Sequence, residues 1–181
     1  MRSTISEIFK SIFPYDNHER EHLKEALDWL DSGAQMFRLF KPNIPDIHLV
    51  AYCVLIDVAQ KQILLVDHKK CNLWLPPGGH VDPDEHPRET AKREMHEELG
   101  IRPELLFTHP VFMTVNETSG GQPGKHTDVS LWYVFSGNIH EKLDFDPHEF
   151  NKISWFKFDE IPIGECEPHL HRFLDKLIKV I

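Results

Sequence analysis

Residues 79–101 read GHVDPDEHPRETAKREMHEELGI and carry most of the information in this 181-residue chain. The stretch predicts a helix over residues 87–99, because Pro87 suits the first helical turn and Gly100 suits the position that ends a helix. An apolar stripe along the predicted helix should pack on a sheet. Its members are Ala91, Met95 and Leu99.

Three glutamates lie beside that stripe, within an arc of roughly 100° at the helical period. They are Glu94, Glu97 and Glu98. Like charges placed so closely cost stability unless cations neutralise them. Hard oxygen ligands on one helix face suit Mg²⁺ or Mn²⁺, and magnesium takes one or two carboxylates together with substrate phosphates. A solvated acidic face has the same pattern, so the glutamates alone leave both interpretations open.

The spacing of the whole stretch resembles the Nudix box, Gly-x5-Glu-x7-Arg-Glu-U-x-Glu-Glu-x-Gly-U, where U is aliphatic. Every specified position matches, with Met95 and Ile101 at the two U positions. The preceding loop, WLPPGG at residues 74–79, also resembles that of the family, although Pro77 departs from the shortest form of the motif. The resemblance extends over about residues 46–181.

The resemblance implies a hydrolase that cleaves a nucleoside diphosphate linked to another moiety. Water attacks a phosphorus while divalent ions, Mg²⁺ or Mn²⁺, bridge the phosphoryl oxygens. Arg93 corresponds to a residue that orients the glutamates, and Glu85 corresponds to its partner. The family's metal ligands correspond to a backbone carbonyl near Gly78 and to the three helix carboxylates, Glu94, Glu97 and Glu98.

The attacking water also needs a group that orients it and accepts its proton. Many family members supply a carboxylate from a late loop, a few residues before a strand that carries a tryptophan. Here Glu149 lies six residues before Trp155. We therefore expect Glu149 to complete a catalytic set with Glu94, Glu98 and Arg93. Four other loop carboxylates remain candidates, namely Glu117, Glu141, Asp144 and Asp146.

The substrate is defined by elimination. The signatures of the ADP-ribose, diadenosine polyphosphate, NADH and coenzyme A subgroups are absent, which leaves a (deoxy)nucleoside triphosphate pyrophosphohydrolase of MutT type as the prediction. The alternatives are a nucleotide-binding sensor without activity and a hydrolase of a nucleotide sugar or ADP-ribose-type substrate. An isoprenoid diphosphate isomerase shares the fold, but in such enzymes the Nudix box departs from the pattern, whereas here it is intact. The sequence identifies no substrate-binding residue, and His80 and His126 flank the expected cleft with either a substrate-contacting or a structural role.

The composition of the chain limits which classes of partner and which cellular compartment we expect. Twenty Lys and Arg against 29 Asp and Glu give a net charge of −9, which argues against a nucleic-acid duplex or an anionic membrane as partner. The three cysteines form no CxxC pair and no apolar run could span a bilayer, so we expect a reduced, cytoplasmic protein. The 13 histidines include no HExxH motif or evenly spaced Cys/His cluster, and their spacing argues against zinc.

The remaining chain predicts an α/β Nudix fold, in which a mixed sheet lies between helices (α/β/α). We expect an N-terminal helical extension over residues 1–43 and a hydrolase domain over residues 44–181. The extension holds two amphipathic helices, whose apolar faces should be buried in a homodimer or over the substrate cleft. The expected strands are 49–56, 63–67, 73–75, 111–115, 129–136 and 153–158, and the expected helices are 3–13, 17–31, 87–99 and 167–180.

Overall fold

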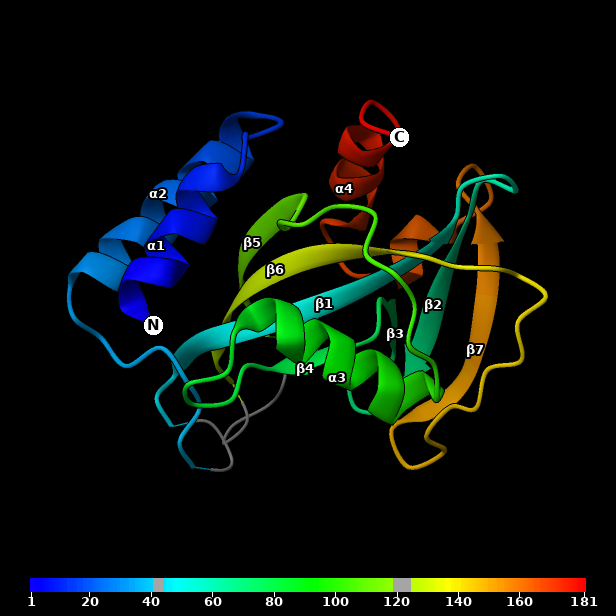
Figure 1. The fold of residues 1–181 in the computed structure, drawn as a ribbon, viewed down its shortest axis with the longest axis horizontal. Coiled ribbons are helices and arrows are strands. Elements are labelled where there is room, and N and C mark those ends of the chain that lie inside the picture. The colour runs from blue at the N-terminus through cyan, green and yellow to red at the C-terminus, as the bar shows by residue number, and fades with distance from the viewer. Residues whose placement is uncertain (41–43, 119–124) are drawn as a thin grey trace.

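A computed structural model of the chain describes residues 1–40, 44–118 and 125–181 (Figure 1). The helices are α1 (Arg2–Ser11), α2 (Asn17–Asp31), α3 (Pro87–Leu99) and α4 (Leu170–Leu177), with a short 3₁₀ turn, η1 (Ile163–Glu165). The strands are β1 (Ile47–Asp57), β2 (Gln62–His68), β3 (Leu73–Leu75), β4 (Gly78–His80), β5 (Phe112–Glu117), β6 (Thr127–Ser136) and β7 (Phe150–Lys157).

The seven strands form one mixed sheet. The order along it is β3-β2-β1-β6-β5, while β4 pairs with β1 and β7 pairs with β2. β1 and β6 are parallel over ten residue pairs, and the other pairings are antiparallel. β1 and β2, which flank the turn after Asp57, form one of these antiparallel pairs.

Helices cover both faces of the sheet, which confirms the α/β/α prediction. Successive residues of a strand point to opposite faces. Ala51 and Cys53 of β1 therefore share a core with α3, and Val54 and Ile56 share a second core with α4. Three aromatic residues of β6 are fully buried in these cores, namely Trp132, Tyr133 and Phe135.

The two N-terminal helices lie side by side at the β5 end of the sheet (Figure 1). Their apolar side chains join the core shared with α3, so intramolecular packing already buries the faces of these helices. Glu19 of α2 is fully buried, and its carboxylate accepts hydrogen bonds from the backbone N–H of Met113 on β5, at 3.3 Å, and from Lys176 Nζ on α4, at 2.8 Å. α2 thus covers the outer edge of β5. The homodimer and the division at residue 43 stay predictions.

Apart from shifts of one to three residues at the ends of elements, the observed elements differ from the expected ones in two respects. Strand β4 was not anticipated, because two of its three residues are glycines and show no apolar alternation. The closing helix spans only Leu170–Leu177, since η1 and the Glu167 turn occupy the preceding residues. Two short stretches lie outside the described residues. They are residues 119–124, which belong to a Gly-rich loop expected between the strands at 111–115 and 129–136, and residues 41–43, which belong to the linker after the N-terminal helices. None of the described helices is long and apolar enough to cross a membrane.

Candidate active site

Helix α3 carries the predicted acidic cluster and has the predicted bounds. Its first turn is capped by His86, whose Nδ1 accepts a hydrogen bond from the backbone N–H of Arg88 at 3.1 Å. It ends at Gly100, whose φ of 71° is the left-handed conformation that glycine adopts without strain. The apolar stripe is completely buried against the sheet, which fixes the rotation of the helix, and consists of Ala91, Met95 and Leu99.

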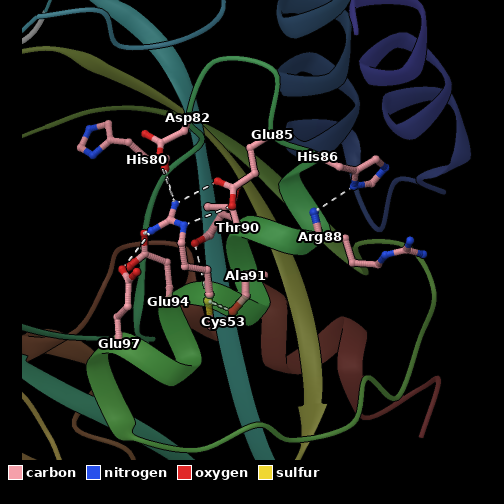
Figure 2. Close-up of polar contacts among 12 residues, drawn as sticks. Cys53, His80, Asp82, Glu85, His86, Arg88, Thr90, Ala91, Glu94 and Glu97 are labelled. Atoms are coloured by element: carbon pink, nitrogen blue, oxygen red, sulfur yellow. Dashed lines mark hydrogen bonds and ion pairs between the residues drawn. The ribbon is translucent and has the colours of Figure 1, made fainter.

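Arg93 is the centre of a network of ion pairs, and Figure 2 labels its partners Glu85, Glu94 and Glu97. Its Nε and Nη2 atoms donate to the two carboxylate oxygens of Glu85, at 3.1 and 2.9 Å. Its Nη1 atom donates to Glu94 at 2.7 Å and to Glu97 at 3.0 Å. Thr90 Oγ1 donates a further hydrogen bond to Glu85 at 2.7 Å. Burial alone would raise the pKa of Glu85, but the bonds from Arg93 and Thr90 lower it, so this carboxylate is ionised.

Glu98 lies deeper than the other glutamates of the cluster, with only 6% of its surface exposed. Its Oε2 atom accepts a hydrogen bond of 2.8 Å from the backbone N–H of Gly78. Burial, followed by repulsion from Glu94, raises the pKa of Glu98 to about 9. Among the described residues, no Lys or Arg side chain pairs with Glu98. A buried carboxyl without a cationic partner is the environment in which a bound cation is most favourable.

The two glycines of β4 form a glycine cradle, in which Gly79 makes room for the carboxylate of Glu94 and Gly78 allows β4 to approach β1 closely. A Cβ atom at Gly79 would overlap the carboxylate of Glu94. Gly78 has a φ of 151°, and a Cβ there would overlap the backbone oxygen of Ala51 on β1. Burial raises the pKa of Glu94 despite the nearby guanidinium of Arg93. Hard oxygen donors, one of them buried without a cationic partner among the described residues, converge on this glycine cradle, and such a donor set fits Mg²⁺ or Mn²⁺.

Glu149 is exposed and directly precedes β7. Its backbone oxygen accepts a hydrogen bond from the N–H of Lys69 at 3.0 Å, which attaches this end of the loop to β2. After burial and the closer charges, the negative charge of Glu149 also raises the pKa of both Glu94 and Glu98. Glu149 is therefore within electrostatic range of the acidic cluster.

The other loop carboxylates that are candidates for activating the water lie in surroundings different from those of Glu149. Glu117, at the end of β5, pairs with Lys125 at 2.8 Å. The backbone N–H groups of Asp144 and Asp146 donate to the carbonyl oxygens of Leu99 and Glu98, so this loop lies against the end of α3. Glu141 is exposed in the same loop.

Comparison with known proteins places this arrangement in a family. The sequence profile of the NUDIX domain matches residues 46–177. The chain belongs to the Nudix hydrolase family. This Nudix chain is 31% identical, over 124 residues, to diphosphoinositol polyphosphate phosphohydrolase 3-alpha of Mus musculus; the match covers 65% of the chain and 70% of the relative. It is 29% identical, over 119 residues, to m7GpppN-mRNA hydrolase NUDT17 of Xenopus laevis; that match covers 59% of the chain and only 40% of the relative.

Solved Nudix structures share the fold. The E. coli dihydroneopterin triphosphate pyrophosphohydrolase superposes with a TM-score of 0.62 at 14% identity, covering 74% of this chain and 96% of that one. A MutT Nudix hydrolase from Burkholderia pseudomallei superposes with a TM-score of 0.56 at 22% identity, covering 72% of this chain and 97% of that one. At these identities the likeness shows the fold alone.

Sequence reasoning missed two parts of the site. The hydrogen bond between Gly78 and Glu98 had no signal, because its donor is a backbone group. The second part concerns His80, whose ring points away from the carboxylates of Glu85 and Glu94 in Figure 2. Burial, followed by the charge of Arg38, lowers the pKa of His80 to about 3, so its ring is neutral. It lies in a separate cluster with His126 and two residues that were not singled out, His48 and Asp128.

Proposed function

We propose that the chain catalyses divalent-metal-dependent hydrolysis of a nucleoside diphosphate linked to another moiety, and that its substrate is a (deoxy)nucleoside triphosphate, as in MutT-type pyrophosphohydrolases. One observation carries the catalytic part of the proposal. The buried carboxyl of Glu98 has no cationic partner among the described residues, and it lies beside Glu94, whose carboxylate fits against β4 because Gly79 has no side chain.

The residues divide the work as follows. The three carboxylates of α3, with a backbone carbonyl near Gly78, would hold Mg²⁺ or Mn²⁺, which polarises phosphoryl oxygens and lowers the pKa of bound water. Arg93 keeps Glu94 and Glu97 in place, and Glu85 keeps Arg93 in place. Glu149, which lies within electrostatic range of the cluster, accepts the proton of the attacking water.

The relatives supply the competing substrates. By name, one acts on diphosphoinositol polyphosphates and another on capped mRNA. The net charge of −9 disfavours a long polyanion such as RNA, because RNA binding rewards a basic surface. It also favours a ligand with few phosphates over a densely phosphorylated inositol.

A substrate panel with Mg²⁺ tests the proposal. It should contain the (deoxy)nucleoside triphosphates, a diphosphoinositol polyphosphate, a capped RNA, ADP-ribose and a nucleotide sugar, with Glu98→Gln as the inactive control. We expect nucleoside triphosphates to be cleaved to monophosphate and pyrophosphate with the highest kcat/KM. Preferred cleavage of any other member would replace the substrate assignment. Tight nucleotide binding without turnover of any member would show a sensor instead.

A further inference from the structure

We propose that His48, His80, His126 and Asp128 bind one zinc ion that holds strand β4 against β1 and β6, separately from the carboxylates of α3. One potential ligand atom from each residue lies within 4.8 Å of the corresponding atoms of the other three. Three imidazoles and a carboxylate form a complete four-ligand set for Zn²⁺. A full set of protein ligands leaves no open coordination position, so the site would be structural.

The sheet brings the four residues together by register. β1 and β6 are parallel, with His48 directly beside Asp128. His126 precedes Asp128 by two residues, which places both on the same face. His80, the last residue of β4, pairs with Val50, which shares the face of His48. The cluster therefore belongs to the face opposite α3, whose core contains the intervening Leu49 and Ala51.

The distances already approach those of a metal site. Asp128 Oδ1 is 3.4 Å from His48 Nε2 and 3.1 Å from His126 Nε2. In a tetrahedral zinc site with bonds of about 2.0–2.2 Å, the ligand atoms are separated by roughly 3.3–3.6 Å. The rings are also close to one another, with centroid separations of 4.7 Å between His48 and His80 and 4.9 Å between His48 and His126. Small side-chain rotations would complete the set.

The hydrogen bond on the far side of His48 shows that its Nδ1 atom carries a proton. His48 Nδ1 is 2.9 Å from the backbone oxygen of Pro45, which can only accept, so Nδ1 carries a proton. In a neutral ring the lone pair then lies on Nε2, which faces the carboxylate of Asp128. Two acceptors in contact require a cation between them, either a metal ion or a second proton on a ring that is completely buried.

Outer hydrogen bonds of this kind are typical of metal-binding histidines. His126 Nδ1 lies 3.2 Å from Thr118 Oγ1, a hydroxyl that can donate or accept, and its Nε2 lies 3.1 Å from Asp128 Oδ1. His80 Nε2 is buried and has no hydrogen-bond partner among the described residues. An unpartnered buried ring nitrogen is costly, and a metal ion shared by the cluster would remove that cost.

His80 connects this cluster to the loop of the candidate active site. Its backbone oxygen accepts a contact of 3.4 Å from Arg93 Nη2, and the two preceding residues are the glycines beside Glu94 and Glu98. A metal ion on the ring of His80 would fix the end of β4 from the opposite face of the sheet. This consequence rests on the proposed function, whereas the zinc site itself does not.

The test measures zinc on the full chain in the presence of excess Mg²⁺, which occupies the carboxylate site. We expect about one zinc ion per chain by elemental analysis, and intense tetrahedral absorption bands when Co²⁺ replaces it. Asp128→Asn and His126→Ala should weaken zinc binding by at least the roughly 10- to 100-fold that loss of an outer-shell partner alone costs. His140→Ala, at an exposed histidine outside the cluster, and Glu98→Gln should bind zinc like the unmodified chain.

Each other result counts against the site. A full chain that takes up no zinc would show that a proton bridges the cluster, and this measurement needs no variant to fold. Zinc binding that is lost in Glu98→Gln and kept in Asp128→Asn would assign the ion to the carboxylates of α3. Because Glu98→Gln removes the proposed hydrolysis while sparing the histidines, failure of the proposed function is distinguishable from failure of the zinc site.

Discussion

The backbone N–H of Gly78 and the side chain of Glu98 are joined by a hydrogen bond of 2.8 Å across 20 positions of the chain. This bond ties the loop before α3 to the last turn of the helix. It also uses one lone pair of a carboxyl that has no cationic partner among the described residues. The candidate metal site is therefore built partly from main chain, and its side chains can be tested individually.

Replacing the carboxyl group of either Glu98 or Glu94 should abolish turnover. Glu98→Gln keeps an oxygen for the N–H of Gly78 but removes the anionic ligand, and Glu94→Gln does the same beside Arg93. We expect both variants to lose Mg²⁺-dependent release of phosphate or pyrophosphate while keeping the thermal midpoint of the unmodified chain. Full activity in both variants, or turnover by the unmodified chain in excess EDTA, would overturn the metal assignment.

Closing the glycine cradle should weaken metal binding without unfolding the protein. In Gly79→Ala the new methyl group overlaps the carboxylate of Glu94, which must move. We expect the Mg²⁺ concentration for half-maximal activity to rise by about tenfold or more, since misplaced ligands cost affinity. Gly164→Ala is the matched control, because a Cβ atom there meets open space. Equal metal dependence in the two variants would contradict the cradle.

The water-activating carboxylate can be identified by two substitutions of the same chemistry. Glu149→Gln should lower kcat by about 10²- to 10⁴-fold, the range for a lost general base, while nucleotide binding survives. Glu117→Gln removes a carboxylate that is paired with Lys125 and should leave kcat unchanged. A large loss in Glu117→Gln with near-normal Glu149→Gln would assign the base to the Gly-rich loop.

The pair formed by Glu19 and Lys176 should be a major determinant of stability. Burial raises the pKa of Glu19 and lowers that of Lys176, so each charge depends on the other. Lys176→Met strands a buried carboxylate and should cost about 3–5 kcal/mol of unfolding free energy in denaturant titrations. Adding Glu19→Gln to that variant should recover part of the loss. In the exposed pair of Lys157 and Glu160, Glu160→Gln should have no measurable effect, and an equal loss there would refute the argument.

Glu167 should make stability depend on pH. Burial raises its pKa to about 7, outweighing the hydrogen bonds from His169 and Leu170. The folded chain therefore retains a proton that the unfolded chain releases near pH 4.5. This contribution is complete below about pH 4.5, declines as pH rises and is lost above about 7. Glu167→Gln lacks this pH-dependent contribution. We therefore expect the thermal midpoint of the variant, relative to that of the unmodified chain, to increase as pH rises from 5 to 8. A constant difference would contradict the assignment.

Local signals predicted the helix that carries the candidate active site. Pro87 and Gly100 predicted both ends of α3, because each residue acts through its own backbone conformation. The helical period then placed three carboxylates beside the buried stripe. These features depend only on residues within one helix, so they follow directly from the spacing of residues in the sequence.

Features that depend on strand pairing were not predictable in the same way. The cluster of His48, His80, His126 and Asp128 is formed by residues from β1, β4 and the start of β6. The spacing of these residues in the sequence does not indicate that they lie close together. The expectation that histidine spacing argues against zinc considered only neighbours along the chain. Alternation along each strand could have indicated that His126 and Asp128 share a face, but not which strand would bring His48 beside them.

The position of α2 along β5 also bears on how the protein avoids self-association. The outer edge of a sheet presents unpaired backbone groups to which a strand of another molecule can bind. Here the carboxylate of Glu19 occupies the N–H of Met113, and the helix blocks approach to the rest of that edge. A chain shortened to residue 44 would expose the edge together with the apolar surface beneath the helices. The first two helices thus cover a sheet edge at which strands of other molecules could otherwise pair.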